Sequence, residues 1–76
     1  MEIEKFVNEF RDQFIDGDEI NFNSETEFRT IGSWDSLTGM SIIVMIKDVY
    51  GVDVSDTEFK SCKTVLEIFE LVVSKK

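Results

Sequence analysis

The sequence predicts an all-α fold: a small bundle of three main helices plus one short helix, with a long loop between the first two helices. Three segments carry apolar residues at helical spacing, at about residues 2–15, 36–50 and from 64 to the end of the chain. The one alternating stretch, Val52-Asp53-Val54, is too short to build a sheet. The 76 residues, 42% of them hydrophobic, suffice for one domain spanning residues 1–76.

The first helix is predicted over about residues 2–15 because its apolar residues recur at steps of three and four. They are Ile3, Phe6, Val7, Phe10 and Phe14. An aromatic stripe of this kind indicates a core face. The run Asp16-Gly17-Asp18 ends the helix.

About twenty residues without strong periodicity then lead to Asp35, which is a long loop for a small domain. The run Ser24-Glu25-Thr26-Glu27 fits a capping box, so one helical turn is expected there. Four apolar residues should pin the loop across the helices, namely Ile20, Phe22, Phe28 and Ile31. Trp34 either packs under the loop or belongs to a docking surface, and the sequence leaves both open.

The second main helix, residues 36–50, should begin at Asp35, whose carboxylate is a good N-cap. Ser36 then falls in the first turn, where free N–H groups and the positive end of the helix dipole favour a phosphate. The plainer alternative is that Asp35 is only a cap and Ser36 a tolerated first-turn residue. Gly51 is the expected C-terminal cap.

Two apolar stripes run along this helix at about 100° per residue. The broader one is the expected core face and contains Gly39, Ile42, Ile43, Ile46, Val49 and Tyr50. The other begins beside Ser36 and contains Leu37, Met40 and Val44, together with Ser41 and Asp48. A surface helix needs only one apolar face, so the second stripe is expected to be exposed and to dock partners. The alternative is a helix buried on both sides.

Two further capping boxes predict the remaining helices. Ser55 with Glu58 opens a short helix through Phe59 and Lys60. Thr64 with Glu67 opens the last helix, whose buried face should contain Val65, Ile68, Phe69 and Val72.

The net charge of −8 argues against a nucleic-acid partner, because binding DNA or RNA depends on basic residues that neutralise phosphates. Proteins with basic patches are the natural partners. The single cysteine, Cys62, excludes an internal disulfide and suits a reducing compartment. The N-terminal residues do not look like a signal peptide, and the longest apolar run, residues 42–46, is far below the ~20 residues that span a bilayer. We expect a cytoplasmic monomer without membrane insertion.

The sequence shows no pattern of catalytic residues. The chain has no histidine for a Ser–His–Asp or Cys–His arrangement and no ligand set for zinc. The chain is therefore not expected to be an enzyme or to hold a metal. Asp12, Asp16, Gly17 and Asp18 match part of a calcium loop, but Phe14 and Asn23 stand where oxygen ligands are required. Cys62 fits a small buried residue better than a reactive thiol.

Four pieces of the sequence, at their mutual spacing, resemble an acyl carrier protein. They are Gly32 three residues before Asp35-Ser36-Leu37, the long apolar helix, the run Tyr50-Gly51-Val52, and the run Thr64-Val65-Leu66-Glu67. The resemblance covers about residues 28–73. It implies an acyl-carrier-like domain over residues 1–76 in which Ser36 is esterified with 4′-phosphopantetheine from coenzyme A, whose thiol carries an acyl group as a thioester.

The same resemblance implies the partners. Asp35 would help the phosphopantetheinyl transferase, and the stripe of Leu37, Met40 and Val44 would meet acyl-transfer and ketosynthase-type enzymes with basic or apolar patches. The pathway would be fatty-acid, polyketide-like or other acyl biosynthesis. Acyl chains in such carriers can fold back between the helices, where the candidate lining residues are Ile42, Ile46, Phe59, Ile68 and Leu71.

The charge pattern departs from that of a fatty-acid carrier. Ser41 and Lys47 stand where acids are usual, and only Asp48 remains. The first thirty residues hold nine acids against three bases, and the rest seven against five. A specialised pathway is expected at least as readily as fatty-acid synthesis. The alternative functions are an unmodified helical interaction module and, third, a calcium-binding regulator.

Overall fold

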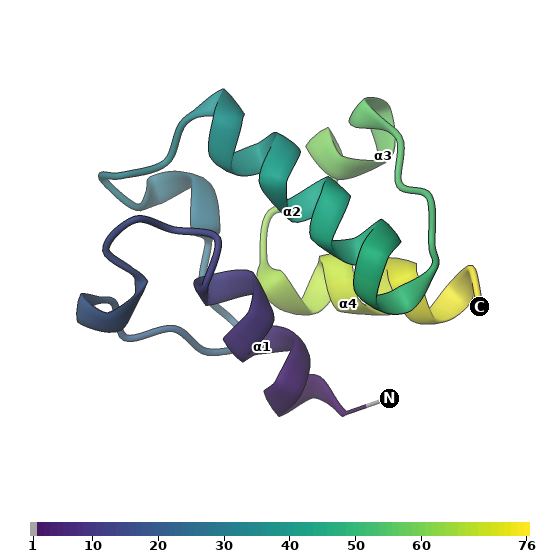
Figure 1. The fold of residues 1–76 in the computed structure, drawn as a ribbon, viewed down its shortest axis with the longest axis horizontal. Coiled ribbons are helices and arrows are strands. Elements are labelled where there is room, and N and C mark those ends of the chain that lie inside the picture. Colours follow the sequence, from purple (N-terminus) through teal and green to yellow (C-terminus); the bar gives the residue numbers. More distant parts are fainter. Residues whose placement is uncertain (1) are drawn as a thin grey trace.

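The computed structural model describes residues 2–76 and contains four α-helices, which confirms the all-α prediction (Figure 1). They are α1 (Ile3–Arg11), α2 (Ser36–Tyr50), α3 (Asp56–Lys60) and α4 (Val65–Ser74). Two short 3-10 turns, Gly17–Glu19 and Phe28–Thr30, lie in the loop between α1 and α2. Within residues 2–76 there is no strand, and a single isolated bridge joins Glu27 to Thr64.

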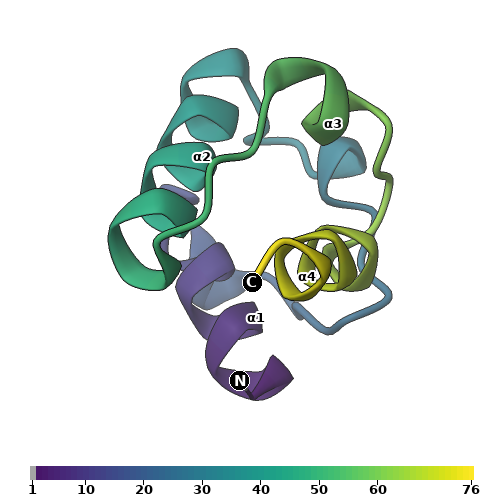
Figure 2. The same cartoon turned by 90° about the vertical axis from the view of Figure 1, so that its right-hand side faces the viewer.

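The arrangement of the helices places α1 against both α2 and α4. Helix α3 lies beside α2 on the side away from α1, as the two perpendicular views show (Figures 1 and 2). The N-terminal end of α2 therefore faces the region of α3 and the end of the long loop, and this is where the functional residues gather.

The predicted caps are present. The carboxylate of Asp35 accepts a hydrogen bond from the backbone N–H of Thr38 at 2.8 Å. Complete capping boxes open α3 at Ser55 and α4 at Thr64. Gly51 ends α2 with a φ of 68°, a left-handed conformation that a residue with a Cβ adopts only with strain.

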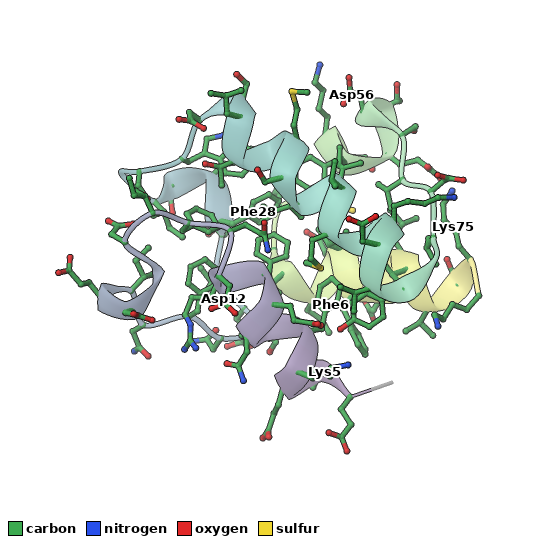
Figure 3. All side chains as sticks on the ribbon, viewed as in Figure 1. Lys5, Phe6, Asp12, Phe28, Asp56 and Lys75 are labelled. Atoms are coloured by element: carbon green, nitrogen blue, oxygen red, sulfur yellow. The ribbon has the colours of Figure 1, made fainter. Side chains whose placement is uncertain are left out.

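The core is built around aromatic rings from α1, the loop and α4. Phe6 and Phe10 are fully buried, as is Phe28 from the loop (Figure 3 labels Phe6 and Phe28). Phe6 packs edge-on against Phe69 with ring centroids 5.4 Å apart, and Phe10 packs against Phe28 at 5.1 Å. The predicted core stripe of the first helix is confirmed.

The first helix is shorter than predicted, because α1 ends at Arg11 instead of near residue 15. The chain then turns back on itself, and Gly17 packs so closely against the carbonyl oxygen of Arg11 that a Cβ there would collide with it. Phe14 still reaches the core, but from a turn. Phe14 fits the three- and four-residue spacing of the helix because its side chain is buried, although its backbone is no longer helical.

A helical turn is present inside the loop as predicted, but it lies at Phe28–Thr30 and not at the capping-box residues. Ser24 and Glu25 form a tight turn in which the N–H of Thr26 donates to the carbonyl oxygen of Asn23 at 3.2 Å. The carbonyl oxygens of Ser24 and Thr26 accept hydrogen bonds from the first amides of α4, Leu66 at 2.8 Å and Val65 at 3.2 Å. This contact between distant segments ties the turn at Ser24 and Glu25 to the start of α4, and the local capping pattern does not form a helix there.

The buried face of α2 also differs in part from the prediction. Gly39, Ile42 and Ile46 are buried as expected. Met45 is only 7% exposed, however, whereas Val49, predicted in the core, is 45% exposed. Val49 lies at the rim of a surface groove beside Gln13 and Asp48, where no other helix covers it.

Candidate functional site

Ser36 is the first residue of α2 and is exposed. Beside it, the Asp35 carboxylate accepts hydrogen bonds from both the N–H and the hydroxyl of Thr38, at 2.8 and 2.9 Å. These bonds, led by the one from the backbone, lower the pKa of Asp35 and keep its carboxylate charged at neutral pH. The site thus offers an accessible hydroxyl at the positive end of a 15-residue helix.

Three serine hydroxyls near the site are engaged in hydrogen bonds, whereas those of Ser36 and Ser41 on α2 are not engaged in the part of the chain that the structure describes, and of these two only Ser36 lies in the first turn of the helix. Ser33 donates to Asp16, Ser61 donates to the carbonyl of Glu58, and Ser55 accepts from the N–H of Glu58 as a helix cap. Among residues 2–76 no hydrogen bond engages the hydroxyl of Ser36. An exposed, unengaged hydroxyl at a helix N-terminus fits attachment of a phosphate ester.

The exposed stripe predicted on α2 is present. Leu37, Met40 and Val44 are 71%, 61% and 55% exposed, so burial of the helix on both sides is wrong. With Ser41 and Asp48 they line a shallow groove of about 570 Å³ that also includes Gln13 and Val49. An apolar strip of this kind, beginning next to Ser36, is typical of a partner-binding surface.

The residues predicted to line an acyl pocket lie together in or against the hydrophobic core. Ile42, Ile46 and Ile68 are fully buried, Phe59 is nearly so, and Leu71 is half-buried. Their side chains come from α2, α3 and α4 and belong to the packed interior, so an acyl chain would have to displace packed atoms to enter among them.

A pocket of about 360 Å³ opens beside Ser36, between α2 and α3. Its apolar lining comes from Trp34, Gly39, Met40, Ile43 and Phe59, and its charged lining from Arg29, Asp56 and Lys60. The amino-acid sequence did not predict this pocket, and it left open whether Trp34 packs under the loop or belongs to a docking surface. A signal was present in Gly39: a glycine inside a helix costs about 1 kcal/mol relative to alanine, which indicates that something packs closely against it.

Arg29, which belongs to the charged lining of this pocket, connects the loop to α3. Its guanidinium donates hydrogen bonds to the carbonyl oxygens of Phe59, at 2.7 Å, and Cys62. It also lies over the rings of Phe28 and Phe59, 4.7 and 5.2 Å from their centroids. The sequence offered no sign of this role, because the contacts span about thirty residues.

Cys62 is buried, and burial raises the pKa of its thiol. A raised pKa opposes thiolate formation, so the structure supports the interpretation of Cys62 as a packing residue.

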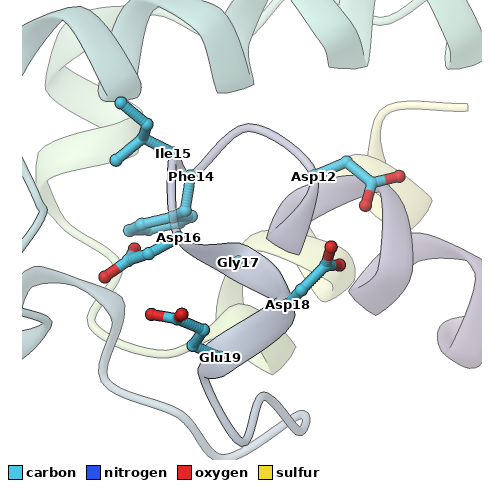
Figure 4. A pocket seen from close by; sticks show the side chains of 7 residues that line it. All are labelled: Asp12, Phe14, Ile15, Asp16, Gly17, Asp18 and Glu19. Carbon is cyan, nitrogen blue, oxygen red and sulfur yellow. The ribbon is translucent and has the colours of Figure 1, made fainter.

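The acidic side chains after α1 do not converge on one point. Figure 4 shows the carboxylates of Asp12 and Asp18 on one side of this segment and those of Asp16 and Glu19 on the other. Within residues 2–76 no group of three or more potential ligand side chains could hold a metal ion.

The comparisons with known proteins agree with this geometry. The family model described as "Phosphopantetheine attachment site" matches residues 7–72, which is most of the chain. Searches of curated proteins and of solved structures gave no match. Among the helices of residues 2–76, none combines the length and apolar character needed to cross a membrane.

Proposed function

The chain belongs to the phosphopantetheine-attachment family of carrier proteins, and on that premise we propose that Ser36 is the residue that carries the prosthetic group. Members of this family are acyl carriers without catalysis of their own, and the prosthetic group is 4′-phosphopantetheine. The group supplies a terminal thiol, on which an acyl group travels as a thioester.

The observation that carries the proposal is the exposed, unengaged hydroxyl of Ser36 at the N-terminus of α2. In the modification, the Ser36 oxygen forms a new bond to phosphorus of coenzyme A, 3′,5′-ADP leaves, and the hydroxyl proton passes to the transferase. The product is a phosphodiester, whose negative charge is stabilised by the first-turn amides of α2. Asp35, charged and adjacent, is placed to interact with a metal ion of the transferase.

The exposed stripe is the proposed docking surface for the transferase and for acyl-transfer and ketosynthase-type enzymes. Leu37, Met40 and Val44 supply its apolar contacts, with Ser41 and Asp48 at its side. The nearby Lys47 pairs with Asp53 at 3.1 Å and adds a positive charge where enzymes with basic patches would prefer an acid. This supports a dedicated carrier for a specialised acyl pathway as readily as a fatty-acid carrier.

We place the protein in the cytoplasm as a single-domain monomer. An acyl chain that folds back would have to enlarge the core among Ile42, Ile46, Phe59, Ile68 and Leu71. Because these residues are close-packed, such a chain would enter only by displacing side chains of α2, α3 and α4.

The test is intact mass after incubation with coenzyme A, magnesium and a broad-specificity phosphopantetheinyl transferase. Wild type should gain one phosphopantetheine and Ser36→Ala none. The matched control is Ser74→Ala, an exposed serine at the end of α4 and outside the docking surface, which should be modified like wild type. A folded, initially unmodified wild type that gains no mass would overturn the proposal and favour an unmodified interaction module.

A further inference from the structure

The pocket between α2 and α3 has a rigid aromatic floor. The indole of Trp34 stacks on Phe59 with an interplanar angle of 19° and packs edge-on against Phe28 at 5.3 Å. The backbone N–H of Trp34 donates to the carbonyl oxygen of Ile31 at 3.0 Å, and the Arg29 guanidinium donates to the carbonyl oxygen of Phe59 at 2.7 Å. Since the floor is already fixed, a ligand would lose little free energy in ordering it.

The rim of the same pocket carries charge. Lys60 is exposed and forms no ion pair within residues 2–76, whereas the Arg29 guanidinium is committed to two carbonyl oxygens. Asp56 stands on α3 four residues before Lys60. The pocket thus offers an apolar floor, one free cation and one anion.

Attachment at Ser36 limits which part of the arm can reach this pocket. Ser36 is itself part of the lining, so the units next to the phosphate are held beside the opening. The first of them is the pantoyl unit, a quaternary carbon with two methyl groups followed by a hydroxyl. The thiol and its acyl group lie at the far end of the arm.

We infer that this pocket seats the pantoyl unit of the prosthetic arm, with its two methyl groups on the indole of Trp34 and its phosphodiester near Lys60. The inference rests on attachment at Ser36. Burial of apolar surface contributes about 25 cal/mol per Å², so two methyl groups give a weak, reversible contact. Such a contact orients the arm without preventing it from entering an enzyme.

The indole gives a direct readout, because Trp34 is the only tryptophan of the chain. In NMR spectra of the modified wild type, the two pantoyl methyl resonances should lie upfield of their positions in free pantetheine, owing to the ring current. Nuclear Overhauser contacts should connect them to the indole protons. Acrylamide should quench Trp34 fluorescence less in the modified than in the unmodified protein.

Two variants sharpen the test. Lys60→Gln should reduce the upfield shift, whereas the control Lys47→Gln, eleven residues after Ser36 on α2 and paired with Asp53, should not. Trp34→Leu should remove the upfield shift while the mass gain persists. If this variant does not fold, the nuclear Overhauser contacts between the pantoyl methyl groups and the indole in the wild type test the seating.

The outcomes separate the two proposals. A mass gain at Ser36 with pantoyl methyl resonances at their free positions and no contact to the indole would overturn the seating and leave the attachment intact. No mass gain would overturn both.

Discussion

Gly39 lies directly against the indole of Trp34: a Cβ on Gly39 would sit 3.1 Å from Cη2 and 3.3 Å from Cζ2 of the ring. Gly39 is one turn after Ser36 on α2, so this contact brings the aromatic floor up to the attachment site. A side chain at position 39 would push the indole away from the helix. The pair therefore shapes the pocket as well as the core.

Gly39→Ala should lower the free energy of unfolding by about 1 kcal/mol, because overpacking against a fixed ring outweighs the better helix propensity of alanine. Chemical denaturation followed by Trp34 fluorescence measures this, and the native emission should shift as well. Gly32→Ala is the control, since a Cβ there meets nothing within 4 Å. Equal stability of the two variants would show that the Gly39 contact is not tight.

Met40→Ser should slow modification by the transferase about tenfold, as expected for the loss of one central apolar contact of at least ~1 kcal/mol at an interface. The fold should remain intact because Met40 is exposed. Initial rates by mass spectrometry and the circular dichroism spectrum check both statements. Val73→Ser on α4 alters an exposed apolar residue away from the site and should leave the rate unchanged.

Lys47→Glu should increase turnover by fatty-acid enzymes, because it replaces a positive charge next to the docking surface by the acid such enzymes favour. Stability should change by less than ~1 kcal/mol, since the lost ion pair with Asp53 is exposed. The measurement is kcat/KM with a fatty-acid ketosynthase at low salt. Unchanged turnover would refute the charge argument. Lys76→Glu controls for net charge, because Lys76 is exposed after the end of α4 and makes no ion pair within residues 2–76.

Stability should fall in acid in part through Glu67. Hydrogen bonds from the backbone N–H groups of Lys63 and Thr64 lower the pKa of this carboxyl from its usual 4.5. Because the pKa of Glu67 is lower in the folded than in the unfolded protein, its stabilising effect is complete at a pH above the unfolded-state pKa. This effect is lost as the pH falls through the folded-state pKa. Glu67→Gln should therefore destabilise the protein at pH 7 and flatten the loss of stability below about pH 4.5.

Urea denaturation at several pH values measures this dependence. Glu70→Gln is the matched control, as Glu70 is exposed on the same helix and makes no hydrogen bond or ion pair with residues 2–76. Parallel pH profiles for wild type and Glu67→Gln would contradict the assigned role of the capping box.

The helix ends that depend on local interactions could be predicted from the amino-acid sequence. The caps at Asp35, Ser55 and Thr64 and the left-handed end at Gly51 involve residues at most four positions apart. Local hydrogen bonds and backbone preferences decide such features, so the bounds of α2, the capping boxes and the exposed stripe could be predicted. The first-turn position of Ser36 indicated a place for a phosphate, and the resemblance to acyl carrier proteins then made it the candidate attachment site.

The contacts between residues far apart in the sequence became known only from the tertiary structure. The carbonyl oxygens of Ser24 and Thr26 accept hydrogen bonds from the first amides of α4, and Val49 is exposed because no helix covers it. Arg29 reaches carbonyl oxygens on α3 and beyond it, and Trp34 reaches Gly39 and Phe59 to form the pocket. These contacts depend on how packed segments share the interior of a small domain, and no local pattern encodes which distant partner a side chain will find.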